Sequence, residues 1–305
     1  MAHRDGRYHI IDLKHLGRPD SIAACVLRSG DGPLLVDPGP ASTLPTLREG
    51  LAKLGIRESD LSAILLTHIH LDHAGGSGTL ARSNPRLKVY VHARGAPHLI
   101  DPGKLVNSAT RLYGERMNGL WGEIAPVPES RLVVLDGGEI LRFGDRRIEV
   151  AYTPGHAWHH VSYFDTEART AYVGDTAGIA GPRLPLVLPV TPPPDFDLEE
   201  WLGSIERIRS WNPAELVLTH FGGSGDPGRH LAALRAGLRD WCGFVEATLA
   251  LPGDDAERIA RFHEMLRDWI RGRAPEALAE QYLAGAGPEA CWQGIARYVR
   301  MRSGQ

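Results

Sequence analysis

Four potential metal ligands lie within six residues of one another in this chain. They belong to the run THIHLDHAGG at residues 67–76, which follows a short apolar segment. Imidazole nitrogens and carboxylate oxygens are the donors that zinc and similar divalent ions bind. Side chains alternate along an extended segment, so His68 and His70 project to the same side and can bind one ion. The turn that follows brings Asp72 and His73 towards a second ion, and its glycines allow the backbone to turn tightly.

Further candidate ligands stand at the ends of short motifs downstream. His156 ends the sequence Thr-Pro-Gly-His, Asp175 ends Val-Gly-Asp, and His220 ends Leu-Thr-His. Each motif is a weak signal by itself, because isolated histidines and strand-end carboxylates are common in proteins that bind no metal. Beside the 67–76 run, however, they complete a set of donors for two ions. We therefore predict that these residues are also metal ligands.

Together with Asp37 in the turn Val-Asp-Pro-Gly at residues 36–39, these motifs resemble the metallo-β-lactamase superfamily. The HxHxDH run is the signature of that family, and the other motifs follow in the family's order over residues 9 to 230. The position of His160, four residues after His156, resembles that of a histidine in the glyoxalase II-like members. The resemblance implies an α+β fold, the four-layer αβ/βα sandwich of this superfamily.

The resemblance also implies how the ligands divide between two ions. Three imidazoles would bind the first ion, two imidazoles and a carboxylate would bind the second, and a further carboxylate would bridge them. The first set is His68, His70 and His156; the second is Asp72, His73 and His220; the bridge is Asp175. We expect two divalent metal ions, zinc in the first place, with iron and manganese as alternatives.

Hydrolysis is the chemistry expected of such a pair of ions. Two cations that share a water lower its pKa into the neutral range and create a metal-bridging hydroxide. This hydroxide would attack a substrate carbonyl. The catalytic role predicted for Asp72 is to orient the nucleophile and to move its proton. Such a mechanism requires no serine or cysteine nucleophile.

Several residues near the motifs are expected to orient ligands or to line the pocket. Asp37 either accepts a hydrogen bond from a ligating imidazole or stabilises its own Pro-Gly turn. The resemblance implies that His160 supports or packs beside the ligands, whereas His159 either faces the pocket or has a structural role. Aromatic residues close to the motifs either contact substrate or pack in the core; they are Tyr113, Trp121, Trp158 and Phe221.

The resemblance favours the glyoxalase II-like and lactonase-like branch, whose members cleave a small thioester, lactone or related ester. The β-lactamase branches are disfavoured, because no cysteine stands at a ligand motif and Asp175 is present. Glyoxalase II has a tyrosine two residues after its last ligand, whereas this chain has Phe221-Gly222-Gly223, which puts hydroxyacylglutathione in doubt as the substrate. Two alternatives stay open: a mononuclear non-haem iron oxidoreductase of the persulfide dioxygenase type, and a non-catalytic metal-binding protein.

The elements that must position these residues are short strands and helices. Apolar runs and alternation predict strands at residues 21–28, 33–36, 61–66, 87–91, 131–135, 147–152, 161–164, 170–173 and 215–218. Helical spacing predicts helices at residues 44–54, 101–121 and, with Asp195 as its N-cap, 195–209. Residues 181–194 are rich in proline and apolar side chains, and predict an irregular segment that serves as a lid, a dimer contact or a packed loop.

From Arg229 onward, alanine, leucine and arginine recur at helical spacing. We therefore divide the chain into a metallo-β-lactamase-like catalytic domain, residues 1–228, and a helical C-terminal extension, residues 229–305.

Composition excludes several classes of partner. Thirty-four lysines and arginines against 37 aspartates and glutamates give a net charge of −3, which offers no global field for nucleic acid or an anionic membrane. No segment reaches the roughly 20 apolar residues that a membrane span needs. Three widely spaced cysteines are typical of reduced thiols in a cytoplasmic protein. We expect a small-molecule substrate, and the apolar 181–194 segment suggests a homodimer.

Overall fold

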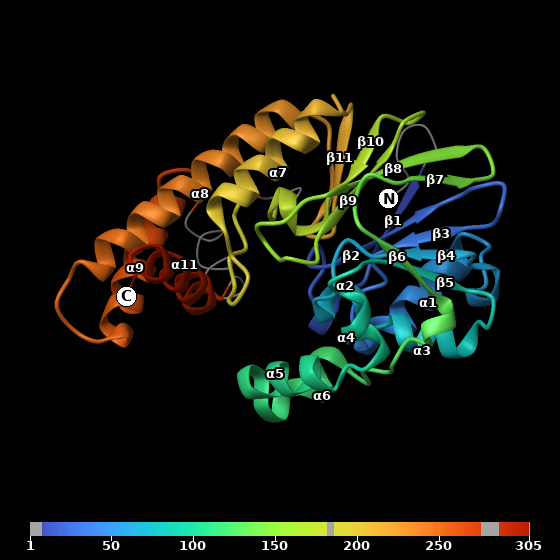
Figure 1. Ribbon diagram of the computed structural model, residues 1–305, viewed down its shortest axis with the longest axis horizontal. Coiled ribbons are helices and arrows are strands. Elements are labelled where there is room, and N and C mark those ends of the chain that lie inside the picture. The colour runs from blue at the N-terminus through green and yellow to red at the C-terminus, as the bar shows by residue number, and fades with distance from the viewer. Residues whose placement is uncertain (1–7, 182–185, 276–286, 305) are drawn as a thin grey trace.

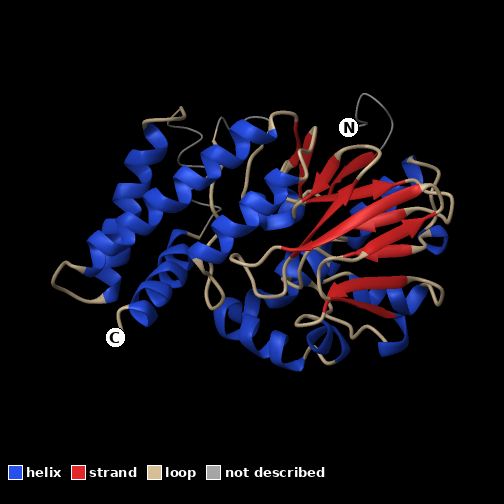
Figure 2. Cartoon of the chain, turned by 45° about the horizontal axis from the view of Figure 1, so that its top comes forward, coloured by secondary structure: helices blue, strands red, loops and turns tan. Residues whose placement is uncertain are grey.

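Two mixed β-sheets lie face to face in the molecule (Figures 1 and 2). The computed structural model describes residues 8–181, 186–275 and 287–304. The first sheet has the strand order β1-β2-β3-β4-β5-β6, and the second has the order β12-β11-β10-β9-β8-β7. The strands of the first sheet are β1 (Tyr8–Asp12), β2 (Ala23–Leu27), β3 (Leu34–Val36), β4 (Ala63–Leu65), β5 (Lys88–His92) and β6 (Leu132–Leu135). Those of the second are β7 (Ile140–Phe143), β8 (Arg146–Tyr152), β9 (Val161–Asp165), β10 (Thr170–Tyr172), β11 (Glu215–Leu218) and β12 (Gly222–Ser224).

The pairing directions explain where the loops meet. Strands β3 to β6 run parallel, and so do β10 and β11, whereas β1–β2–β3, β7 to β10 and β11–β12 are antiparallel. Parallel neighbours end at the same edge of a sheet, so the segments that follow β4, β10 and β11 can approach one another there.

Helices cover the outer face of each sheet. The longer ones are α1 (Leu44–Lys53), α3 (Ser77–Ser83), α5 (Gly103–Tyr113), α7 (Leu198–Ser210), α8 (Pro227–Leu249), α9 (Asp255–Arg271) and α11 (Pro288–Arg302). The short α-helices are α2 (Leu71–Ala74), α4 (Ala96–Ile100) and α6 (Met117–Trp121). The 3-10 turns are η1 (His15–Gly17), η2 (Ala41–Thr43), η3 (Glu58–Asp60), η4 (Gly114–Arg116), η5 (Glu129–Arg131) and η6 (Gly174–Ala177). Figure 1 shows α7 and α8 along the second sheet, α1 and α3 below the first, and α5 and α6 projecting from the body.

Alternation along the strands builds the layers. Val26 on β2 faces outward into a cluster with α1 and α3, whereas its neighbour Leu27 faces inward between the sheets. On β11, Leu216 and Leu218 pack outward against the C-terminal helices, while Val217 joins the core between the sheets. The central strands β2, β3, β4 and β11 are buried on both faces and are almost wholly apolar, whereas the outer strands β6 and β7 keep exposed residues. This confirms the predicted four-layer αβ/βα sandwich with a helical C-terminal segment.

Most predicted elements coincide with observed ones, and the differences have local causes. The N-cap of α7 is Asp197, whose carboxylate accepts from the backbone N–H of Glu200 at 3.0 Å, so the prediction of Asp195 as the cap was wrong. Asp195 instead accepts from the backbone N–H of Trp158 at 3.3 Å. The helix predicted over residues 101–121 is broken at Gly114, which has a φ of +54°. Strands β1, β7 and β12 were missed by the sequence prediction.

The irregular segment around residues 181–194 packs within the chain where the structure describes it. Leu188 is fully buried, and it pairs with Ile179 in an isolated antiparallel bridge. Leu186 is also buried, in the cluster formed by the C-terminal helices. Residues 182–185 of the predicted segment lie outside the described residues.

The C-terminal helices share a hydrophobic cluster with α7 and with the outer face of the second sheet. The boundary at residue 228 stays a prediction. Within the described ranges, none of the helices combines the length and the apolar character that a membrane span requires. The cysteines Cys25, Cys242 and Cys291 are free and buried.

Candidate metal centre

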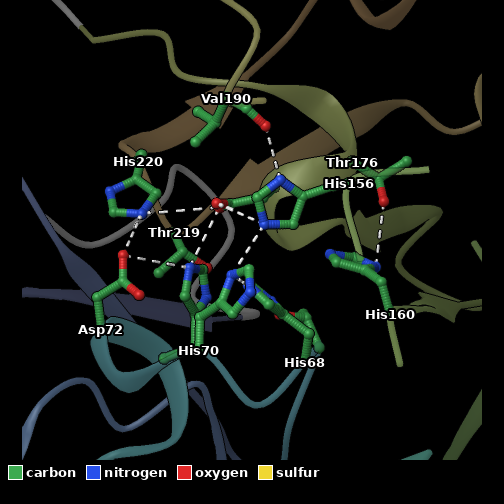
Figure 3. A network of polar contacts seen from close by, with 12 residues as sticks. His68, His70, Asp72, His156, His160, Thr176, Val190, Thr219 and His220 are labelled. Atoms are coloured by element: carbon green, nitrogen blue, oxygen red, sulfur yellow. Dashed lines mark hydrogen bonds and ion pairs between the residues drawn. The ribbon is translucent and has the colours of Figure 1, made fainter. Parts of the chain in front are cut away.

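All seven predicted ligands converge at the edge where the strands of both sheets end. The 68–73 run follows β4 and enters α2, and His156 lies in the connection between β8 and β9. Asp175 belongs to η6, directly after β10, and His220 follows β11. Figure 3 shows five of these side chains directed towards one another from separate segments of the chain: His68, His70, Asp72, His156 and His220.

Three imidazoles form the first group of donors. His70 Nδ1 lies 2.9 Å from His68 Nε2 and 3.0 Å from His156 Nε2. His70 thus presents Nδ1, whereas the other two present Nε2. The three ligand atoms lie within 4.8 Å of one another, as the donors of a single ion must.

Asp72, His73 and His220 form the second group. His220 Nε2 lies 3.3 Å from Asp72 Oδ2, and His73 Nε2 lies 3.8 Å from the same oxygen. The two groups are joined through the chain itself, because Asp72 and His73 lie on α2, whose N-cap is His70 of the first group.

Asp175 lies between the two groups. Its Oδ1 is 3.2 Å from His73 Nε2 and 3.6 Å from His220 Nε2, and its Oδ2 is 3.4 Å from His156 Nε2. Each oxygen of one carboxylate therefore faces one group of imidazoles. This is the arrangement that a bridging ligand needs.

Unsatisfied buried atoms show that the residues fit divalent cations. His73 Nε2 and Asp175 Oδ1 are buried without a hydrogen-bond partner, which is costly in a protein interior. His70 Nδ1 faces two ring nitrogens at once, although an imidazole nitrogen satisfies only one such partner. The separations are close to the edge of a tetrahedron, about 3.3 Å, around an ion with nitrogen bonds of about 2.0 Å.

The outer nitrogens of three of the candidate ligand rings have oxygen partners. His156 Nδ1 lies 2.7 Å from the carbonyl oxygen of Val190, and His220 Nδ1 lies 2.8 Å from that of Ser21. His68 Nδ1 lies 3.1 Å from Thr67 Oγ1. A proton on the outer nitrogen leaves the inner lone pair for a metal and fixes the ring orientation. Val190 and Ser21 were not predicted, because a backbone carbonyl has no signal in sequence.

Asp37 accepts a hydrogen bond from the imidazole of a candidate ligand, which is one of the two roles expected for it from the sequence. Its Oδ2 lies 2.8 Å from His73 Nδ1, and it also accepts from Thr67 Oγ1 at 2.7 Å and Thr219 Oγ1 at 2.8 Å. Its Oδ1 accepts from the backbone N–H of Thr67 at 2.8 Å. The fully buried carboxylate therefore ties together the strand ends that carry His68, His73 and His220.

Electrostatics divides the site into a neutral and a charged half. Burial lowers the pKa of His156 to about 4, and burial followed by repulsion from neighbouring imidazoles lowers the pKa of His68. Burial also opposes a charge on His73, but the carboxylates of Asp175, Asp72 and Asp37 outweigh it and raise its pKa. The acidic side chains thus gather around the second group, where they compensate positive charge.

His160 and His159 lie beside the candidate ligands in different ways. His160 is fully buried and stacks on His68, with ring centroids 4.9 Å apart, and its Nδ1 lies 3.0 Å from Thr153 Oγ1 and 3.1 Å from Thr176 Oγ1. His159 meets His70 edge to face at 5.4 Å and keeps 12% of its side chain exposed. His160 is therefore a buried packing partner of the candidate ligands, whereas His159 lies beside them and is partly exposed.

The predicted aromatic residues fall on two sides of the site. Tyr113 and Trp121 pack against each other on the α5–α6 arm, with ring centroids 5.2 Å apart. The pKa of Tyr113 is raised by burial and then by the carboxylate of Asp72, so the arm lies within electrostatic reach of the second group. Trp158 adjoins His159 and carries the guanidinium of Arg94 over its ring at 5.3 Å.

Phe221, directly after His220, donates its backbone N–H to the carbonyl oxygen of Ala180 at 2.8 Å, and Ala180 donates its own N–H to that of His220 at 2.7 Å. Its side chain is half-buried.

Comparison with known proteins places the chain among relatives of the same fold. A Sulfurisphaera tokodaii "metallo-beta-lactamase fold-containing protein ST1585" is 29% identical over 53% of this chain and 61% of its own length. Hydroxyacylglutathione hydrolases of Nostoc punctiforme and a Synechococcus strain are 27% and 29% identical, over 77% and 87% of this chain and 71% and 79% of theirs. The solved structure of the Thermus thermophilus metallo-beta-lactamase family protein TTHA1429 superposes with a TM-score of 0.68 at 22% identity, covering 97% of this chain and 94% of that one.

The model of the metallo-beta-lactamase superfamily matches residues 17–220, which hold every predicted ligand. Fold and sequence therefore agree that the chain belongs to the metallo-beta-lactamase superfamily.

Proposed function

We propose that the protein is a binuclear metal-dependent hydrolase that cleaves a small thioester or a related ester. The observation that carries the proposal is the position of Asp175, whose two oxygens face two separate groups of three ligands. Zinc is the ion we expect at both positions, with iron and manganese as alternatives.

A pair of divalent ions in such a site activates water as a nucleophile and polarises a carbonyl oxygen. Asp72 is the residue placed to handle the water. Its side chain is 26% exposed, more than that of His220 or Asp175 at 12% and 3%. The imidazoles of His73 and His220 outweigh burial and hold its pKa low, so the carboxylate stays ionised and can accept a hydrogen bond from an entering water.

The relatives support a thioester as the substrate class. The Nostoc and Synechococcus proteins are named hydroxyacylglutathione hydrolases and match most of this chain. The chain departs from glyoxalase II two residues after His220, where it has Gly222 in place of a tyrosine, so an acyl thioester other than hydroxyacylglutathione is the expected substrate. Beside His70, the residues His159, Trp158 and Arg94 offer aromatic and cationic groups to a small acyl compound.

Metal analysis and a substrate panel test the proposal. The purified protein should contain two divalent ions per chain and hydrolyse a thioester or lactone, but not a phosphodiester, among a panel of the three classes. His70→Ala and Asp175→Ala should each lower metal occupancy and reduce kcat/KM by roughly 100-fold or more. Glu123→Gln, a change in an exposed ion pair with Arg82, is the matched control and should leave both unchanged.

Three outcomes would contradict the proposal. Near-wild-type turnover of Asp175→Ala at full metal content would rule out a mechanism that depends on Asp175. Bound iron with oxygen consumption on glutathione persulfide would show the dioxygenase-type alternative, and bound metal without turnover of any panel compound would show a binding protein. A homodimer is a separate proposal, which sedimentation of the unmodified chain decides.

A further inference from the structure

The C-terminal helix α11 is connected to the candidate metal centre through residues 190–194, the segment whose Val190 carbonyl contacts His156. His156 Nδ1 lies 2.7 Å from the carbonyl oxygen of Val190, as Figure 3 shows. Val190 belongs to no helix or strand of the described chain, so no ladder of backbone hydrogen bonds fixes its carbonyl. Its position depends on what the neighbouring residues pack against.

Those neighbours lie directly on α11. A Cβ atom at Gly294 would stand only 2.0 Å from the carbonyl oxygen of Thr191 and 2.8 Å from the carbonyl carbon of Pro192, so only glycine permits this approach. Thr191 Oγ1 donates to the carbonyl oxygen of Cys291 at 3.2 Å, and Arg297 Nε donates to that of Pro194 at 3.2 Å. The backbone directly after Val190 is therefore seated on the helix, from Thr191 to Pro194.

Aromatic side chains make a second connection between the same helix and the same ligand. Tyr298 on α11 meets Phe196 at 5.3 Å between ring centroids, and Phe196 meets Trp201 at 6.0 Å. Trp201 in turn meets the imidazole of His156 edge to face at 5.6 Å. Trp201 is fully buried, and its Nε1 donates to the carbonyl oxygen of Thr176 at 2.8 Å, so its ring is held firmly against His156.

Among the described residues, the rings of the second group are oriented from other parts of the chain. His220 is oriented by the carbonyl oxygen of Ser21, and His73 is oriented by the carboxylate of Asp37. Both partners belong to the N-terminal half of the chain, on loops of the first sheet. A displacement of α11 would therefore move the first group and spare the second.

We infer that α11 is a positioning element for the metal site of His68, His70 and His156, with Gly294 as the position that seats the 191–194 backbone. This rests on the proposed function, because it takes His156 as a ligand. It assigns the C-terminal helix a role beyond covering the sheet: the helix sets the affinity of one of the two metal sites through the orientation of His156.

Stepwise cobalt(II) titration of the full chain tests the inference, with calorimetry and the visible absorption spectrum as readouts. His156→Ala and His220→Ala identify which binding step belongs to which site. Gly294→Ala should weaken the step that His156→Ala abolishes by about 10–100-fold, and leave unchanged the step that His220→Ala abolishes. Gly243→Ala, in α8, is the matched control, because a methyl group there meets no atom within 4 Å.

The ratio of the two affinities separates positioning from general destabilisation, which would weaken both steps together. Equal weakening of both steps, or wild-type titration of Gly294→Ala, overturns the inference. If Gly294→Ala does not fold, Thr191→Val tests the inference instead, since it nearly keeps the side-chain volume and removes the hydrogen bond to Cys291. It should weaken the binding step that His156→Ala abolishes and leave unchanged the step that His220→Ala abolishes. A wild-type chain that binds no cobalt would refute the proposed function itself, which is a different result.

Discussion

Asp37 is the residue on which the candidate centre depends most closely without being a ligand. Four donor groups converge on its carboxylate: two from Thr67, one from Thr219 and one from His73. It has a φ of +48°, a conformation that aspartate and asparagine adopt more readily than other side chains. Asp37 therefore has two separate roles: it adopts a backbone conformation with a positive φ, and its carboxylate orients the His73 imidazole. A substitution can change one role and keep the other.

Asp37→Asn changes the charge and keeps the backbone preference. An asparagine has one acceptor oxygen where four donors converge, so the His73 ring loses its anionic partner. We expect metal affinity at the Asp72, His73 and His220 site to fall by about 10–100-fold, measured by competition with a chelating dye. Asp195→Asn, at a partly exposed carboxylate, should leave this affinity at the wild-type value. Unchanged affinity in Asp37→Asn would show that the hydrogen bond to His73 does not orient the ring.

Helix α8 contacts the site region through a histidine of its own. His230 is buried, and its Nε2 donates to the carbonyl oxygen of Ala177 in η6, the turn that carries Asp175, at 2.8 Å. Burial lowers the pKa of His230, and the hydrogen bond to Ala177 only partly offsets this. The neutral ring is thus part of the packing between the C-terminal helices and the sheet.

This contact gives the folded state a pH dependence with a definite sign. Below the unfolded pKa of about 6.5 the unfolded chain takes up a proton at His230 before the folded chain does, so stability falls as the pH falls. The free energy of unfolding, relative to that of His230→Gln, should be constant above pH 7.5. It should decrease towards pH 5 by at most about 1.4 kcal/mol per pH unit. Urea unfolding of both proteins at several pH values measures this difference in the free energy of unfolding. A difference that does not change with pH would contradict the lowered pKa of His230.

At the scale of the whole molecule, the candidate ligands come from both halves of the sandwich. The 68–73 run extends from the first sheet, whereas His156, Asp175 and His220 extend from the second. Bound ions would therefore cross-link the two sheets at one edge, in addition to the apolar core between them. Metal binding to the folded state alone adds to its stability by mass action.

Chelation should consequently lower the melting temperature. Each ion held at 100 times its dissociation constant adds about 2.7 kcal/mol. For a chain of this length, removal of two ions should lower Tm by roughly 10 °C. Differential scanning calorimetry with and without dipicolinate measures the shift. His220→Ala should show a smaller shift because it has less bound metal to lose, and an equal shift in both proteins would indicate that the chelator acts elsewhere.

The sequence by itself determined the residue types, the family and most of the strands, but not β1, β7 and β12. Short-range rules suffice for these, because the spacing of His68 and His70 fixes their shared direction, and alternation along β2 and β11 fixes which side chains share a face. Local signals failed where several residues compete for one role. Asp195 and Asp197 are both acceptable caps in sequence, and only the position of Trp158 decides between them.

Only the tertiary structure decided what holds the ligands in place. The partners of His156 and His220 are the backbone carbonyls of Val190 and Ser21, and every residue carries such a carbonyl. Likewise, helix propensity alone treats Gly294 as unfavourable in a helix, whereas the fold shows another segment of backbone lying against it. Contacts between distant segments depend on how whole layers pack, and no window of neighbouring residues contains that information.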